Sequence, residues 1–157
     1  MTLLESAFYD LAGLLLVPVL VLILLSLAYA VFALGGFLVE AVQRLRGRAA
    51  STLRAYQRRT GAASDDLELL IMRRLEWLRI TARSAPMLGL IATMIPMGPA
   101  LLALTRSDAR GVGENLVVAF SAVILALAAA SISFLVLTVR RRWLLEELRA
   151  IEREAAA

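Results

Sequence analysis

One apolar stretch of the sequence carries residues that could form a path for ions. Between Ser84 and Thr105, small or polar side chains recur at three- or four-residue spacing, which places them on one side of a helix; they are Ala85, Gly89, Thr93, Met97 and Ala100. Such a stripe allows another backbone, or a line of water, to approach closely. The hydroxyl of Thr93 lies ten residues into this stretch, where a polar group needs a hydrogen-bond partner or water.

Prolines in the same stretch leave backbone carbonyls without helical donors. Pro96 removes the donor to the carbonyl of Ala92, and Pro99 removes the donor to that of Ile95. In lipid these groups need partners, so their side of the helix should meet protein or water. Two interpretations remain open: an ion path, or a face that only permits close helix packing.

Other chemistry has few candidate residues. The chain has no His and no Cys, which removes the commonest metal ligands and every thiol nucleophile. No phosphate-binding Gly-rich loop or nucleophile elbow is present. The acidic residues mostly lie at helical spacing from arginines, as Glu76 does from Arg73 and Arg79. We therefore expect no enzyme, no catalytic residue, no metal site and no cofactor.

The elements that position Thr93 follow from the distribution of apolar residues. The 157 residues are 61% hydrophobic, more than a small water-soluble domain hides in its core. Three uncharged blocks, at 11–38, 84–105 and 114–139 with Glu114 at its head, are each long enough to cross the ~30 Å hydrocarbon core as a helix. A signal peptide is the competing interpretation of the first block. The acidic residues Glu5 and Asp10 and the length of the apolar run argue against it.

The segments between the blocks are predicted to be mostly helical. The loop 40–83 has a helical pattern from Val39 to Thr60, a stop at Gly61 and a helix start at Ser64. A short outer loop, 106–113, joins the second and third spans. The tail 140–157 continues the third helix, so a single rod of roughly 60 Å should run from Glu114 to about Glu154. The predicted fold is all-α: one integral membrane domain, 1–157, with three transmembrane helices that extend into the cytoplasm.

The arginines predict the orientation of the chain. All 17 basic residues are arginines; ten lie in the loop and five in the tail, against two, Arg106 and Arg110, between the second and third spans. The positive-inside rule places loop and tail in the cytoplasm and the N-terminus outside. The net charge of +4 is explained by arginines beside anionic lipid, so no nucleic-acid partner is expected. This predicts a multi-pass protein of the inner (cytoplasmic) membrane with a cytoplasmic C-terminus.

The second span carries a family resemblance. The string Ala85-Pro86-x-x-Gly89-Leu90-x-x-Thr93, followed by Glu114 at the head of an Ala- and Ser-rich third helix, resembles the MotA/TolQ/ExbB proton channel family. The resemblance implies a homopentamer around a single-span partner whose intramembrane aspartate carries the proton. It also implies that Thr93 is the pore hydroxyl of the second helix. Glu114, with Asn115 beside it, would mark the outer pore mouth.

The third helix departs from the family pattern at one position. Ala119 stands where many relatives have a second pore threonine, and Ser121 follows two residues later. The full set of expected pore-lining residues is Thr93, Gly89, Met97, Ala119, Ser121, Ala122 and Ala126. Small residues at this spacing suit packing against a central partner helix or against a sister subunit equally well.

Two functions from different classes follow. The first is a channel-forming stator subunit of an ion-motive-force-driven motor, with either protons or sodium as the ion. No span contains Asp, Glu, Lys, Arg or His apart from Glu114 at its outer edge, so a partner must supply the titratable carboxylate. The alternative is a non-conducting oligomeric scaffold that recruits a cytoplasmic partner through its arginine-rich loop.

Overall fold

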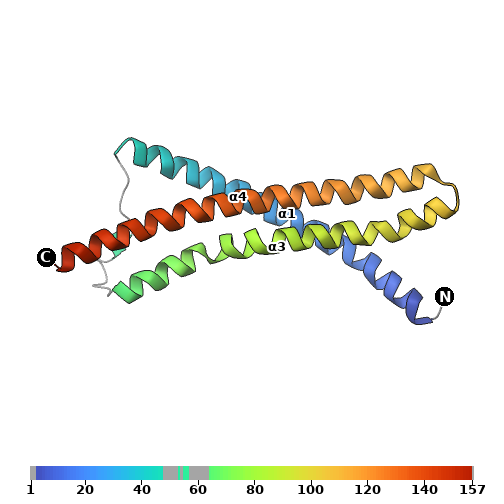
Figure 1. Cartoon of the computed structure of the whole chain (residues 1–157), viewed down its shortest axis with the longest axis horizontal. Helices are drawn as coiled ribbons and strands as arrows, with labels where there is room; N and C mark the ends of the chain where they lie inside the picture. Colours follow the sequence, from blue (N-terminus) through green and yellow to red (C-terminus); the bar gives the residue numbers. More distant parts are fainter. Residues whose placement is uncertain (1–2, 48–52, 54, 57–63, 157) are drawn as a thin grey trace.

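The computed structural model describes residues 3–47, 53, 55, 56 and 64–156, and three long helices account for nearly all of them. They are α1 (Leu3–Leu45), α3 (Ser64–Thr105) and α4 (Ala109–Ala156). Helices α3 and α4 form an antiparallel hairpin, and α1 crosses it obliquely (Figure 1). The N-terminal part of α1 diverges from the hairpin near the α3–α4 turn. The opposite end, which holds the start of α3 and the end of α4, is called here the arginine-rich end.

The three helices confirm the predicted fold class. Each is long and apolar enough to cross a membrane, over Asp10–Leu45, Asp66–Thr105 and Ala109–Glu154. The start of α3 at Ser64 and the uninterrupted course of α4 agree with the sequence pattern.

Helix α1, however, ends at Leu45 and does not continue to Thr60. Gly47 has a φ of +65°, which glycine adopts without strain, and its amide donates to the carbonyl of Arg44 at 3.1 Å. The predicted stop at Gly61 lies outside the described residues.

The connection between α3 and α4 is a tight turn. The amides of Arg106 and Asp108 both donate to the carbonyl of Ala103, at 3.1 and 3.0 Å. The carboxylate of Asp108 accepts a hydrogen bond from the amide of Gly111 at 3.0 Å and so caps the start of α4. Because α4 begins at Ala109, much of the segment expected as an outer loop is already helical.

The interior consists of two different kinds of contact. At the arginine-rich end large aliphatic side chains form a bundle that includes Leu53; its other fully buried members are Leu67, Leu75, Leu78 and Val136. Along the apolar spans the buried residues are mostly alanines, namely Ala30, Ala85, Ala92, Ala122, Ala126 and Ala129. Burying large apolar side chains stabilises helix contacts most where those side chains would otherwise face water. Between helices in lipid, the main attraction comes instead from close approach of the two backbones, which small residues allow.

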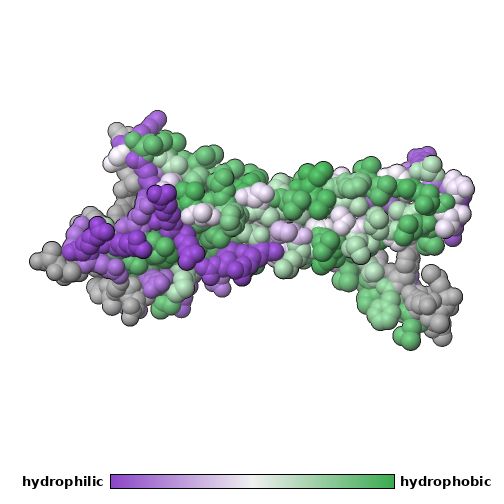
Figure 2. All heavy atoms as spheres, viewed as in Figure 1, coloured by the Kyte–Doolittle hydropathy of each residue, from purple (hydrophilic) through white to green (hydrophobic). Residues whose placement is uncertain are grey.

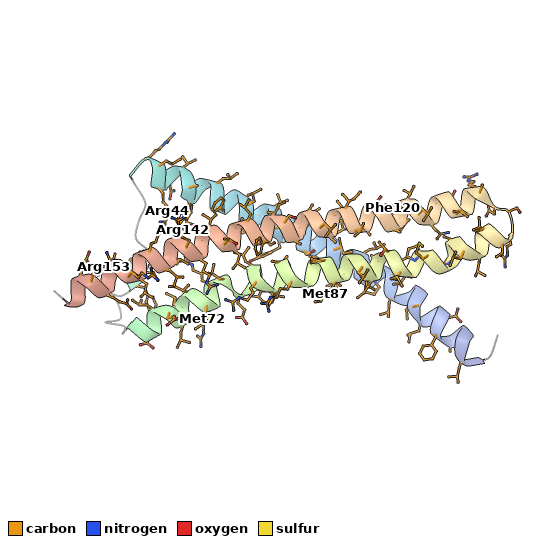
Figure 3. All side chains as sticks on the ribbon, viewed as in Figure 1. Arg44, Met72, Met87, Phe120, Arg142 and Arg153 are labelled. Carbon is orange, nitrogen blue, oxygen red and sulfur yellow. The ribbon has the colours of Figure 1, made fainter. Side chains whose placement is uncertain are left out.

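The surface of the spans is strongly apolar. Figure 2 shows hydrophobic residues over the middle of the molecule and hydrophilic ones gathered at the arginine-rich end, with a smaller group at the α3–α4 turn. Met87 and Phe120 extend outward from α3 and α4 (Figure 3) and are 66% and 60% exposed. A water-soluble protein would not leave so much apolar surface uncovered, so lipid or other subunits must cover it.

Candidate functional site

Thr93 lies on α3 within the membrane-spanning segment and is partly exposed. Its hydroxyl donates to the carbonyl of Leu90 at 2.7 Å, which is one turn earlier in the same helix. The need for a hydrogen-bond partner is therefore met within α3. The oxygen keeps lone pairs that can accept a further bond from water or from a protonated carboxyl group.

The remaining predicted pore residues fall into two groups. Met97 and Ser121 are exposed on α3 and α4. The other group is buried within the chain and consists of Gly89, Ala119, Ala122 and Ala126. A Cβ atom on Gly89 would lie 2.8 Å from Cβ of Ala126 and 3.4 Å from a methyl of Val123, so here the two helices are in backbone-close contact.

The predicted outer mouth lies at the first turns of α4. Glu114 forms an ion pair with Arg110 at 2.9 Å, and both side chains are well exposed. The Asn115 amide donates to the carbonyl of Gly111 at 2.8 Å. Glu114 is thus paired with an arginine of its own helix, and a surface pair of this kind contributes little to stability.

One side of the hairpin is covered by α1. Val19 and Ile23 pack against Ala92, Ala122 and Ala126, while Ala30 packs with Ala85 and Ala129. Thr93, Met97, Leu127 and Phe134 occupy helical positions turned away from α1, and we call this side the open face. On the open face, no described part of the chain covers the exposed side chains Met97, Leu127 and Phe134.

A polar cluster that sequence reasoning missed joins α1 to α4. Glu40 accepts from Arg44 at 3.4 Å and from Arg140, a hundred residues away, at 3.2 Å. The guanidinium of Arg44 lies 4.5 Å from the ring centroid of Trp143, which stacks on Phe37 with centroids 5.3 Å apart. The sequence shows its members but not their contact: Glu40 is a lone carboxylate just after the first apolar block, and Trp143 follows the third block after three arginines.

Comparison with known proteins gives a family match, and it covers the helices that carry the predicted pore residues. The sequence profile of the MotA/TolQ/ExbB proton channel family matches residues 32–153, which include all of α3 and most of α4. The chain belongs to this family. No curated protein and no solved structure matches the chain.

Membership in the MotA/TolQ/ExbB family fixes the broad function. It implies a proton channel of energy-transducing motor or stator complexes, which is a non-enzymatic function. Members of the family generally work with single-span partners. Among the described residues no group of three or more acidic side chains could hold a metal ion.

Proposed function

We propose that this chain is the channel-forming stator subunit of an ion-motive-force-driven membrane motor, and that a single-span partner supplies the titratable carboxylate. The observation that carries the proposal is the open face, where Thr93 and Met97 lie on α3, the helix that the family resemblance implies lines the pore. The chain has no Asp, Glu, Lys, Arg or His between residues 115 and 139 or between 84 and 105. A proton relay across these spans therefore requires a group from another chain.

Within the proposal, the predicted pore residues have two different roles. Thr93 and Met97 are accessible on the open face and form the lining; Ser121 is also exposed, but it lies about 120° around α4 from Leu127 and would face the ion path only if α4 were rotated or shifted. Gly89, Ala119, Ala122 and Ala126 are buried behind it, and Gly89 and Ala126 hold α3 and α4 in backbone-close contact. Glu114 and Asn115 lie at the outer mouth, where the Glu114 side chain is well exposed, so water should make the loss of its charge tolerable.

The proposed assembly is a ring of identical subunits, with five copies expected from the family resemblance. The open face supports this, since Leu90 and Leu127, which are 63% and 50% exposed, could be covered by neighbouring copies and by the partner's helix. We place the N-terminus outside and the arginine-rich end in the cytoplasm, on the basis of the arginine distribution.

The test is removal of the Thr93 hydroxyl. Thr93→Val keeps the side-chain shape and removes the group that can accept a bond on the ion path, so proton flux should be abolished while expression and oligomer persist. Flux is measured in vesicles that contain the partner, with the number of subunits determined by native mass spectrometry.

Thr105→Val is the matched control. The Thr105 hydroxyl donates to the carbonyl of Leu102 at the same 2.7 Å, but it lies at the last residue of α3. Loss of the Thr105 hydroxyl should change proton flux by no more than about twofold from that of the unsubstituted protein. The variant loses the same local hydrogen bond as Thr93→Val, but at the end of α3. Equal flux in both variants would remove Thr93 from the ion path, whereas the absence of flux in the unsubstituted protein together with its partner would favour the non-conducting scaffold.

A further inference from the structure

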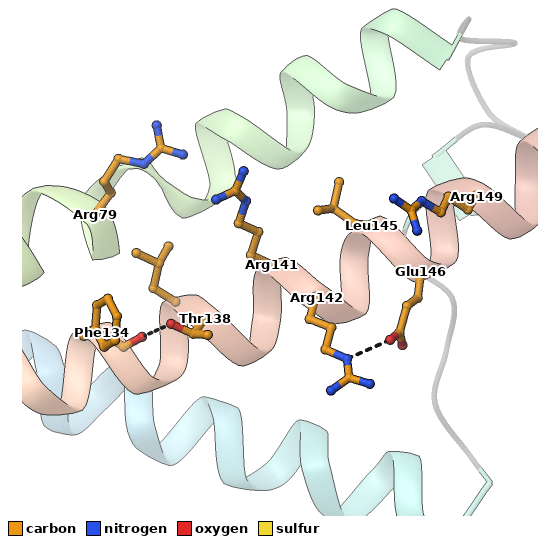
Figure 4. A pocket seen from close by; sticks show the side chains of 9 residues that line it. Arg79, Phe134, Thr138, Arg141, Arg142, Leu145, Glu146 and Arg149 are labelled. Carbon is orange, nitrogen blue, oxygen red and sulfur yellow. Dashed lines mark hydrogen bonds and ion pairs between the residues drawn. The ribbon is translucent and has the colours of Figure 1, made fainter.

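A groove lined by arginines lies between α3 and α4 towards the arginine-rich end. It encloses about 580 Å³ and is lined by Arg79 of α3 and by Arg141, Arg142 and Arg149 of α4. Arg79 and Arg141 extend into the space between the two helices, whereas Arg142 turns towards Glu146 (Figure 4). Arg140 and Trp143 face α1 instead, so the groove lies on the opposite side of α4.

The charges in the groove are not balanced by the residues that the structure describes. Four arginines line it against one carboxylate, that of Glu146, which pairs with Arg142 at 2.9 Å. Over the part of the chain that the structure describes, Arg79, Arg141 and Arg149 form no ion pair. Like charges gathered beside an apolar wall repel one another, and a bound anion would relieve this repulsion.

The groove changes character along its length. Phe134 and Leu137 line the part within the predicted span 114–139, and Phe134 is 63% exposed. Arg141 and Arg142 follow directly after that span, at the depth where the hydrocarbon core meets the phosphates. An apolar wall that leads into a cluster of guanidinium groups matches a phospholipid, with its acyl chain beside Phe134 and its phosphate beside Arg141. Free phosphate would leave the apolar part empty, and an acidic peptide has no acyl chain to fill it.

We propose that this groove binds one anionic phospholipid, with its phosphate held by Arg79, Arg141 and Arg149 and an acyl chain along Phe134 and Leu137. Binding neutralises the cluster and fills the gap between α3 and α4 on the open face. The proposal concerns lipid retention and does not depend on ion conduction.

The test compares two triple variants in a neutral detergent, where the added lipid is the only anionic amphiphile. The groove variant is Arg79→Gln/Arg141→Gln/Arg149→Gln, and the control, Arg73→Gln/Arg74→Gln/Arg153→Gln, removes the same charge outside the groove. Phosphatidylglycerol is titrated and the bound form is counted by native mass spectrometry. We expect affinity to fall by roughly fivefold per groove arginine, on the order of 100-fold in all, and by at most about twofold in the control.

Further arms separate the possible ligands. Inorganic phosphate and an octaglutamate peptide should not displace the lipid, and zwitterionic phosphatidylcholine should bind more weakly than phosphatidylglycerol. Equal losses in the two triple variants would overturn the proposal, as would displacement by inorganic phosphate. Displacement by octaglutamate would overturn it in favour of an acidic protein segment. If the groove variant fails to fold, Arg141→Gln alone should still lower the affinity about fivefold, and unchanged binding in that variant would refute the site.

Discussion

At the scale of single residues, Gly89, Thr93 and Met97 show what helical spacing can and cannot predict. The sequence places them on one stripe, four residues apart. Because each step of four residues turns a helix by about 40°, the stripe rotates gradually away from any straight neighbour. Gly89 is accordingly buried against Ala126, Thr93 is partly exposed and Met97 is exposed. Helical spacing predicted that the three residues share one side of α3. Which of them contacts α4 depends on where the two helices cross.

Gly89 provides a prediction about helix packing. Gly89→Ala should destabilise the protein by about 1–3 kcal/mol, because the new Cβ would come within 2.8 Å of Ala126 Cβ and force α3 and α4 apart. The double variant Gly89→Ala/Ala126→Gly should recover much of this loss. The free energy of unfolding in a denaturing detergent titration, followed by circular dichroism, measures both changes.

Gly35→Ala serves as the control for Gly89. A Cβ at Gly35 would meet no atom of the described residues within 4 Å, so this change should be neutral or stabilising by up to about 1 kcal/mol through helix propensity. A Gly89→Ala protein as stable as the Gly35→Ala protein would show that α3 and α4 are not in backbone-close contact at this point.

At the scale of elements, the sequence predicted the helices better than their contacts. Uncharged blocks and the cap at Ser64 were sufficient to locate α3 and α4. The end of α1 was missed because the apolar pattern continues beyond Leu45, while the backbone turns at Gly47. The Glu40–Arg140 pair joins residues a hundred positions apart, and no local pattern in one sequence indicates such a contact.

The cluster between α1 and α4 predicts the effect of losing an aromatic ring. Trp143→Ala removes the stack on Phe37 and the cation–π contact with Arg44, and it should cost about 1–3 kcal/mol. Hydrogen exchange measured by mass spectrometry should show faster exchange in residues 37–45 of α1. Trp77→Ala, at an exposed position on α3, should leave exchange there unchanged. Equal protection in the two variants would mean that Trp143 does not hold α1 in place.

At the scale of the whole molecule, the composition of the sequence predicted that the helices are surrounded by lipid and not by water. The apolar surface over the three spans is the direct result of a sequence that is 61% hydrophobic. The oblique path of α1 was not predictable, because a helix that is apolar on nearly all sides gives no indication of which side packs. The candidate site was likewise predictable only in part. The sequence predicted which residue types it contains, whereas the structure was needed to show which side of the α3–α4 hairpin is the open face.

Orientation yields a prediction for the intact cell. The chain has no native cysteine, so single cysteines report one position each. A cysteine replacing Arg106, at the α3–α4 turn, should react with a membrane-impermeant maleimide in intact cells, and one replacing Arg153 should react only after lysis. Each variant labelled in open membranes provides the control for accessibility. Labelling of the Arg153 variant in intact cells would reverse the proposed topology.

Helix α4 runs without proline or glycine from Glu114 to its end at Ala156. Its 48 residues correspond to a rigid lever of about 72 Å, which passes from the turn end through the span to the arginine-rich end. A tilt of about 5° about the turn end would move the far end by about 6 Å over that length. Helix α3, with three prolines in its membrane half, has no such continuity of hydrogen bonds. Small displacements beside Thr93 would therefore be transmitted to the arginine-rich end mainly by a tilt of α4, and the movement would increase with distance from the turn.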